Sequence, residues 1–143
     1  MSSISDLEPW LRPWARWIRH YGEYLVLRER KAGFTVGPRG VEPRSARAKG
    51  GMFRITSTYR SPRKQAELYN AWISGRSSIP AAPPGQSAHQ YRIAFDMARN
   101  RDPFTDDLLH ELGDVWSSYG GLYGRHNFDP VHFQAGPTPT GRV

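Results

Sequence analysis

Apolar residues near the start of the chain recur at helical spacing. Seven of them each lie three or four positions from another member of the set: Leu7, Trp10, Leu11, Trp14, Trp17, Ile18 and Tyr21. This pattern predicts an amphipathic helix over about residues 6–21. Asp6 is a candidate N-cap, and Pro13 is expected to kink the helix or delay its start. A stripe of three tryptophans can lie on a membrane surface, but we interpret it as a face packed on the core.

After this helix the pattern alternates between strand and helix. Residues 24–27 either extend the helix or begin a strand, residues 33–36 have β-forming character, and residues 37–51 read as a mobile basic loop. Four further strands are predicted, at residues 53–59, 92–98, 122–125 and 131–134. Two further helices are predicted, one after Ser61-Pro62 to about Ser74 and one capped by Thr105 and ending near Tyr119. The proline-rich residues 75–85 should form a loop, and the tail after Ala135 should be poorly ordered.

Composition agrees with one soluble globular domain over residues 1–143. The chain has 38% hydrophobic and 13% aromatic residues, which suffices for a sizeable core, and a mean hydropathy of −0.67. We expect a monomer. The first thirty residues lack the apolar run of a secretory signal or membrane span, so we expect synthesis in the cytoplasm and export by another route.

Charge and cysteine content narrow the chemistry. The formal net charge is +7, which favours nucleic acid, anionic membrane or an anionic polymer such as bacterial cell wall, without choosing among them. The chain has no cysteine, so disulfides and thiolate ligands are excluded. A metal would therefore be held by histidine and carboxylate.

Two separated motifs supply such ligands. His89 ends a loop, Asp96 follows on a predicted strand, and His132 lies on a distant strand, which gives the three protein ligands typical of a catalytic zinc site. Asp129 is joined to His132 by a tight turn, so its carboxylate can lie near the metal without binding it. A general base needs this position. Each histidine alone is more often an ordinary core or surface residue.

The motifs resemble the zinc D-Ala-D-Ala carboxypeptidase and L-alanyl-D-glutamate endopeptidase family. The similar stretches are Ser87-Ala88-His89, Ala94-Phe95-Asp96, Asp129 with His132, and residues 57–61 followed by Gln65. The resemblance covers about residues 53–134, the expected catalytic core, and implies an α+β fold of the hedgehog/DD-peptidase type, with a small antiparallel sheet flanked by helices. It also implies that His89, Asp96 and His132 bind Zn2+ and that Asp129 is the catalytic base. It also implies that Arg60 binds or polarises the substrate, with help from Ser87 and Gln65. Gln134, on the strand of His132, either bonds to that histidine or is an ordinary strand residue.

One position departs from the family pattern, because Arg92 stands where the family has glycine. If that position needs an unusual dihedral angle, arginine there costs energy or reshapes the pocket. A catalytically silent metal-binding or wall-binding module, like the related signalling domain of hedgehog proteins, is therefore an alternative. A basic nucleic-acid-binding protein is a further alternative, although no specific nucleic acid is expected. The favoured function is a zinc peptidase acting on peptidoglycan stem peptides as a cell-wall lysin of bacteriophage type.

Overall fold

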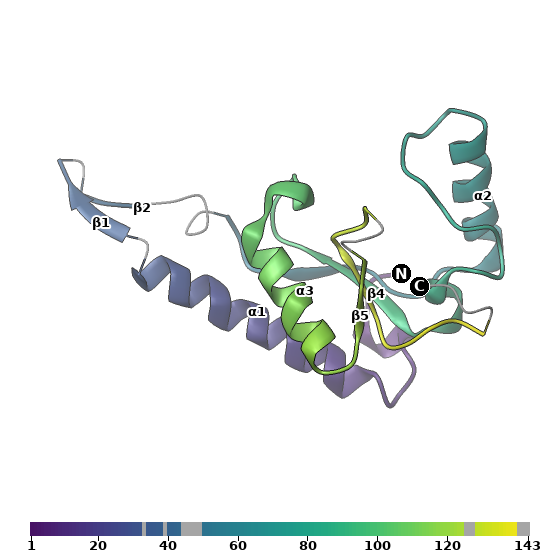
Figure 1. Cartoon of the computed structure of the whole chain (residues 1–143), viewed down its shortest axis with the longest axis horizontal. Helices are drawn as coiled ribbons and strands as arrows, with labels where there is room; N and C mark the ends of the chain where they lie inside the picture. The colour runs from purple at the N-terminus through teal and green to yellow at the C-terminus, as the bar shows by residue number, and fades with distance from the viewer. Residues whose placement is uncertain (33, 39, 44–49, 125–127, 140–143) are drawn as a thin grey trace.

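The computed structural model describes residues 1–32, 34–38, 40–43, 50–124 and 128–139 (Figure 1). Its α-helices are α1 (Arg12–Ala32), α2 (Pro62–Ile73) and α3 (Asp107–Ser118). Short 3-10 helices are η1 (Ile4–Asp6), η3 (Ala88–Tyr91) and η4 (Pro103–Thr105). Within these ranges no helix combines the length and the apolar character needed to cross a membrane.

The strands form two antiparallel sheets. A two-stranded sheet pairs β1 (Phe34–Gly37) with β2 (Gly40–Pro43). A four-stranded sheet has the order β3 (Arg54–Ser57), β4 (Ala94–Ala98), β6 (His132–Gln134) and β5 (Leu122–Tyr123). The predicted α+β fold, a small antiparallel sheet flanked by helices, is confirmed.

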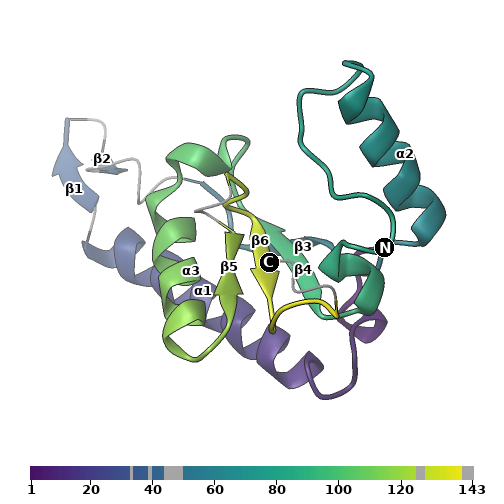
Figure 2. The same cartoon turned by 45° about the vertical axis from the view of Figure 1, so that its right-hand side comes forward.

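The core lies between one face of the four-stranded sheet and two helices. Phe95 of β4 pairs with Phe133 of β6, and their rings stack with centroids 5.6 Å apart. Trp116 of α3 packs edge-on against Phe95 at 5.4 Å. Helices α1 and α3 lie together on this side of the sheet, whereas α2 stands apart at the other end (Figures 1 and 2). Since neighbouring strand residues point to opposite faces, Asp96 and His132 point away from this core.

The first helix differs from its prediction at both ends. Pro13 lies in the first turn of α1, so the helix starts at Arg12, and it continues through residues 24–27 to Ala32. Asp6 is not the N-cap, because its carboxylate instead accepts hydrogen bonds from the Ser3 amide and the Thr58 hydroxyl. The buried residues of α1 are Ala15, Ile18, Gly22, Leu25 and Val26, and Leu11, just before the helix, is also buried.

The interpretation of the tryptophan stripe as a core face is therefore wrong in part. Trp10 and Trp14 are 57% and 48% exposed. They stand one position away from the buried residues Leu11 and Ala15, which is enough to turn a helical side chain toward the solvent.

Of the other predictions, some are confirmed and some are wrong. Ser61 caps α2 and Pro62 opens it, as expected. The expected cap Thr105 is wrong, because Asp106 accepts a hydrogen bond from the Leu109 amide at the start of α3. The predicted loop contains β2, and the basic residues 39, 44, 47 and 49 lie outside the described residues. The tail is ordered at Thr138, which is buried, and its last four residues are not described.

A buried ion pair ties the start of α3 to the end of β4. Arg99 directs its Nε and one terminal nitrogen at both oxygens of Asp106, at 2.9–3.2 Å. Both side chains are almost fully buried. Such a pair holds its two segments together, since separating the partners would leave a charge in a medium of low polarity.

Removal of the Asp106 carboxylate should therefore be costly. We expect Asp106→Ala to lower the free energy of unfolding by about 3–5 kcal/mol, because it takes the neutralising carboxylate from buried Arg99 and also the cap from α3. Urea denaturation measures this value. The neighbouring Asp107 is exposed in the first turn of α3, so Asp107→Ala is the matched control and should have little effect. Equal losses in the two variants would contradict this role.

Candidate metal centre

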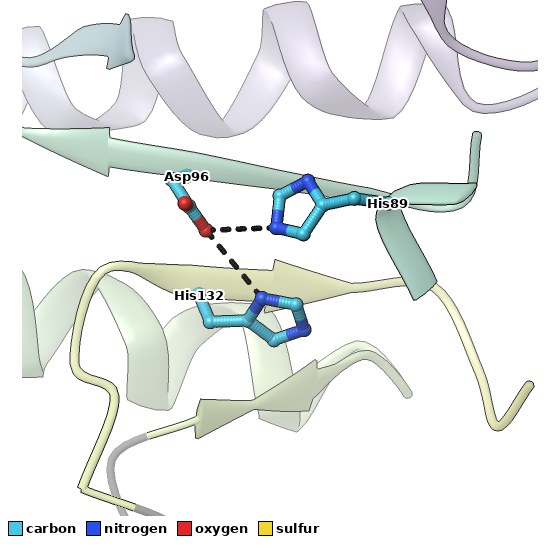
Figure 3. A group of neighbouring side chains, drawn as sticks. All are labelled: His89, Asp96 and His132. Carbon is cyan, nitrogen blue, oxygen red and sulfur yellow. Dashed lines mark ion pairs between the residues drawn. The ribbon is translucent and has the colours of Figure 1, made fainter. Parts of the chain in front are cut away.

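Three elements bring the predicted ligands together. His89 lies in η3, just before β4, while Asp96 is the middle residue of β4 and His132 is the first residue of β6. The register of the sheet sets Asp96 directly opposite His132. Figure 3 shows both imidazole rings turned toward the Asp96 carboxylate. The three predicted ligands thus meet at one point on the sheet face away from the core.

Their distances suit a single small cation. Asp96 Oδ1 lies 3.2 Å from His89 Nε2 and 3.4 Å from His132 Nδ1. One ligand atom from each residue lies within 4.8 Å of the others. All three side chains are largely buried. The cluster therefore offers two nitrogens and one carboxylate oxygen in a site shielded from solvent.

Hydrogen bonds behind the rings fix which nitrogen of each imidazole carries its proton. His89 Nδ1 lies 2.6 Å from the carbonyl oxygen of Thr58, and His132 Nε2 lies 2.7 Å from Oε1 of Gln134. The Gln134 amide nitrogen in turn donates to the Gly136 carbonyl, which leaves Oε1 as the acceptor. Each histidine therefore donates on its outer side, and in the neutral ring the inner nitrogen presents a lone pair to Asp96.

This arrangement fits a metal ion. Two lone pairs and a carboxylate oxygen face one another, and Asp96 Oδ1 is buried without an aligned hydrogen-bond donor. Such groups repel one another unless a positive charge lies between them. Histidines that donate their other N–H to a carbonyl are the usual ligands of metal centres, and two histidines with one carboxylate are a common catalytic zinc set.

Metal-free, the cluster stabilises itself with protons. Burial lowers the pKa of His132, but the close Asp96 carboxylate outweighs it and holds that pKa above its ordinary value. Burial would raise the pKa of Asp96, but the approach of His132 and His89 holds that pKa well below its usual range. A proton on His132 thus occupies the role that a cation would take.

Asp129 stands beside this cluster without entering it. Its Oδ2 lies 3.9 Å from His132 Nδ1, and its side chain is 53% exposed. Partial burial, followed by the charge of Asp96, raises the pKa of Asp129, while the charges of His132, His89 and Arg60 oppose that rise. A carboxylate with a raised pKa that reaches both solvent and the cluster can exchange protons with a reacting water.

Arg60 is positioned by two neighbours. Its amide donates to the carbonyl of His89 at 3.1 Å, and its guanidinium donates to Oε1 of Gln65 at 3.1 Å. Gln65 is buried, and its amide nitrogen donates to the carbonyl of Ala82 in the proline-rich loop. Both ends of the Gln65 side chain are therefore engaged, so it holds Arg60 against that loop. That Arg60 and Gln65 bind substrate stays a prediction.

Ser87 caps the short helix η3, which carries His89. Its hydroxyl accepts a hydrogen bond from the His89 amide, at 3.3 Å, as the cap of η3. It therefore supports the backbone that carries a predicted ligand, and its predicted contact with substrate stays untested.

Arg92 adopts the backbone conformation that favours glycine. Its φ is 60° and its ψ is 26°, in the left-handed region, where it ends η3. Its guanidinium stacks 3.9 Å above the ring of Tyr59 and donates to the carbonyl of Asp6 at 2.8 Å. The side chain therefore binds the N-terminal segment, and the contacts made there offset the strain of the turn.

Two supporting residues carry no sequence signal of their own. Thr58 is fully buried and acts through its main-chain carbonyl on His89. Gly124 lies behind the site, where an added Cβ would meet the carbonyl oxygen of Asp129 at 2.5 Å and the Cβ of His132 at 2.9 Å. Thr58 acts through a main-chain atom that every residue has, and Gly124 acts by lacking a side chain, so both can be identified only once the fold is known.

A family model described as VanY, D-alanyl-D-alanine carboxypeptidase, matches residues 43–117, which is more than half of the chain. The chain belongs to the VanY family. The match includes Arg60, Ser87, His89 and Asp96 and ends before Asp129 and His132, which the pairing of β4 with β6 brings to the same place. The resemblance predicted from the motifs is confirmed. No curated protein sequence matches the chain.

Several solved structures are similar to parts of the chain. A vancomycin-resistance D,D-dipeptidase, VanXYg, in complex with a D-Ala-D-Ala phosphinate analogue is 23% identical with a TM-score of 0.47, over 62% of this chain and 44% of that one. A VanY D,D-pentapeptidase mutant from a VanB-type cassette, in complex with Zn(II), is 18% identical with a TM-score of 0.48, over 82% and 70%. The L,D-carboxypeptidase DacB of Streptococcus pneumoniae is 19% identical with a TM-score of 0.41, over 84% and 65%. The chain thus spans less than half of the first protein.

The hydrogen bond between His132 and Gln134 leads to a prediction about zinc binding by this VanY-family chain. Gln134→Met keeps the side-chain length but removes the acceptor for His132 Nε2, and it should weaken zinc binding by about 10–100-fold. Gln134→Glu is the matched control, since it keeps an acceptor at that position and should retain much more of the affinity. Competition with a fluorescent chelator measures both. Equal affinities in the two variants would show that the bond does not orient His132.

Zinc should stabilise the protein in a pH-dependent way. The protonated form of His132 stabilises the metal-free fold fully below the ordinary histidine pKa of about 6.5 and ceases to do so as pH rises through the raised value. Zinc binding has the opposite dependence, since its ligands must be deprotonated. The rise in melting temperature on adding zinc should therefore be larger near pH 8 than near pH 5.5.

Thermal unfolding with zinc or with a chelator tests this dependence. His132→Ala should abolish the zinc-induced shift, whereas His20→Ala, on an exposed part of α1, should preserve it. A shift of the same size at both pH values would contradict binding through these imidazoles.

Proposed function

We propose that this VanY-family protein is a zinc-dependent peptidase that hydrolyses peptide bonds in the stem peptides of peptidoglycan. The observation that carries the proposal is the meeting of two inward lone pairs and the Asp96 carboxylate beside a separate, partly exposed carboxylate, Asp129. A structural metal site needs only the two histidines and Asp96. A hydrolase also needs a separate carboxylate such as Asp129.

The chain's own residues would divide the work. His89, Asp96 and His132 would hold zinc, which when bound supplies a Lewis acid that acidifies water and polarises a carbonyl. Asp129 would take a proton from the attacking water and return it to the leaving amine, a role suited to its raised pKa and its exposure. Arg60, fixed by Gln65, would hold the substrate by a carbonyl or carboxylate oxygen near the reacting bond.

The position of Arg92 removes the main reason for a silent module. That alternative depended on a large cation within the motif, but the guanidinium lies against Tyr59 and the carbonyl of Asp6 and is engaged there. The left-handed turn that the motif needs is formed with arginine in place of glycine. The proposal therefore keeps the enzymatic function.

The finer parts of the proposal concern the bond and the biological setting. We propose cleavage either of a terminal D-Ala-D-Ala bond or of an internal L-Ala-D-Glu bond, by a monomer that works as a cell-wall lysin of bacteriophage type. The net charge of +7 supports action on an anionic wall. Masses of the released products distinguish the two bonds, since the first reaction frees one alanine and the second cuts the stem from its glycan-linked alanine.

The decisive variant is Asp129→Ala. It should lower the rate of hydrolysis of purified peptidoglycan by about 10²–10⁴-fold, because the proton transfer loses its base, while zinc content stays unchanged. His132→Ala should lose both zinc and activity. Mass spectrometry of the digest and metal analysis give the two readouts.

A matched control is Asp107→Ala, in which an exposed carboxylate far from the cluster in sequence is removed. Its activity should equal that of the unmodified protein. Full activity of Asp129→Ala would overturn the mechanism, and absence of hydrolysis by the zinc-loaded, unmodified protein would overturn the proposed function.

A further inference from the structure

Gly85 is held at both of its main-chain polar groups by the short helix that carries His89. Its amide donates to Oε1 of Gln90 at 2.7 Å, and its carbonyl oxygen accepts a hydrogen bond from the hydroxyl of Tyr91. Gln90 and Tyr91 follow His89 directly in η3. We call these two side chains the Gly85 clamp. They attach the end of the proline-rich loop, which returns from α2 toward the sheet (Figure 2), to the element that supplies a proposed ligand.

The clamped glycine ends a stiff stretch of chain. Residues 82–85 read Ala-Pro-Pro-Gly, and each proline ring fixes its own φ. The Gln86 amide donates to the carbonyl of Pro83 at 3.1 Å, which closes a turn. Gly85 stands third in that turn with a φ of 86°, as a type II turn requires. We call residues 82–85 the Pro-Pro segment. Because it is stiff, a displacement of Gly85 is passed on to Ala82.

Ala82, at the other end of the Pro-Pro segment, is connected to Arg60. Its carbonyl oxygen accepts a hydrogen bond from the buried side chain of Gln65 at 2.7 Å, and the same side chain accepts one from the guanidinium of Arg60 at 3.1 Å. The Arg60 amide in turn donates to the carbonyl of His89. The contacts therefore form a closed ring, which runs from η3 through the Pro-Pro segment and Gln65 to Arg60 and back to η3.

The guanidinium of Arg60 has little besides Gln65 to hold it. Among the residues that the structure describes, its other hydrogen-bond contact is with Ser57 Oγ at 3.5 Å, which is long for such a bond. Its charge opposes the rise in the pKa of Asp129, so the guanidinium lies within electrostatic reach of the proposed base. An arginine side chain that is free to move loses affinity when a ligand orders it. The hold on Gln65 therefore matters for the cation that is proposed to bind substrate.

We propose that Gln90 and Tyr91 are positioning residues for the reaction. By holding Gly85 they fix the Pro-Pro segment and, through Gln65, keep the guanidinium of Arg60 in place beside the proposed metal site before the substrate arrives. The substrate then binds to a cation that is already ordered. This proposal rests on the proposed function, because it concerns the side chain that would hold an oxygen of the stem peptide.

The contacts of His89 decide against a direct effect of the clamp on zinc binding. The His89 ring is oriented by the carbonyl of Thr58, and its amide is bonded to the hydroxyl of Ser87. Neither contact involves the side chain of Gln90 or Tyr91. Loss of the clamp should therefore change the binding of substrate and leave the binding of zinc as it is.

The mobility of the Arg60 side chain gives the first test, which needs no activity. Nuclear magnetic resonance relaxation of the side-chain Nε–H reports its order on the picosecond-to-nanosecond timescale. Tyr91→Phe removes only the hydroxyl, and it should lower the order parameter of Arg60 Nε–H in the zinc-loaded protein. The same group of Arg99, in its buried ion pair, should stay unchanged. Tyr24→Phe, at an exposed tyrosine of α1, is the matched control.

Gln90 offers an independent pair of variants. Gln90→Met removes the acceptor for the Gly85 amide and should loosen Arg60 as Tyr91→Phe does. Gln90→Glu keeps an oxygen at that position and should retain the order of Arg60. Circular dichroism melting shows that each variant is folded, and metal analysis shows that each carries zinc.

Kinetics on a soluble stem pentapeptide test whether this hold serves the reaction. Tyr91→Phe should raise KM by about 2–10-fold, which corresponds to one hydrogen bond, with little change in kcat. The same substitution in a Gln65→Met background should raise KM no further, because the connection from the clamp to Arg60 is already broken there. A clamp that only supported the fold would give the same effect in both backgrounds.

Three results would overturn the proposal. The first is an Arg60 side chain that is equally ordered in Tyr91→Phe and in the unmodified protein. The second is an unchanged KM in Tyr91→Phe, and the third is a rise in KM of the same size with and without Gln65→Met. If the unmodified protein cleaves no stem peptide, the proposed function fails, and the relaxation measurements still decide whether the clamp holds Arg60.

Discussion

The pairing of β4 with β6 is the interaction on which the site depends. In one register it sets Phe95 beside Phe133 in the core and Asp96 beside His132 on the opposite face. A slip of β6 by one residue would turn Phe133 out of the core and bring His132 into it, which would part His132 from Asp96. The free energy of burying two aromatic rings therefore also fixes the distance between two proposed ligands. The proposed metal site therefore needs no further interaction to align Asp96 with His132.

The position of His89, the third proposed ligand, depends on a strained turn. His89 reaches the sheet because η3 ends in the left-handed conformation of Arg92, after which the chain enters β4. Glycine would adopt this conformation without strain, whereas arginine brings compensating contacts to Tyr59 and to the N-terminal segment. The same segment reaches the site by another path, since Met1 accepts a hydrogen bond from the amide of Thr58, whose carbonyl orients His89. The orientation of His89 thus depends on residues at the far end of the chain.

The sequence was sufficient to predict the residues that act through distinctive side chains. His89, Asp96 and His132 could be predicted to meet, because an alternating strand and a recognisable motif limit where they can lie. Thr58 could not, because a carbonyl oxygen leaves no trace in residue identity, and Gly124 acts by lacking a side chain. The spacing of Trp10, Trp14 and Leu11 also suited more than one helical face. Only the packing of Leu11 and Ala15 on the core shows which rings remain outside.

Gln134 connects His132 to α3. Its side chain accepts a hydrogen bond from His132, while its main-chain carbonyl accepts the indole N–H of Trp116. Trp116 also packs edge-on against Phe95, which pairs with Phe133 in the core. Because the two hydrogen bonds use different parts of one buried residue, the orientation of His132 depends on how α3 packs on the sheet. A change in that packing would therefore shift one of the proposed ligands, although α3 itself supplies none of them.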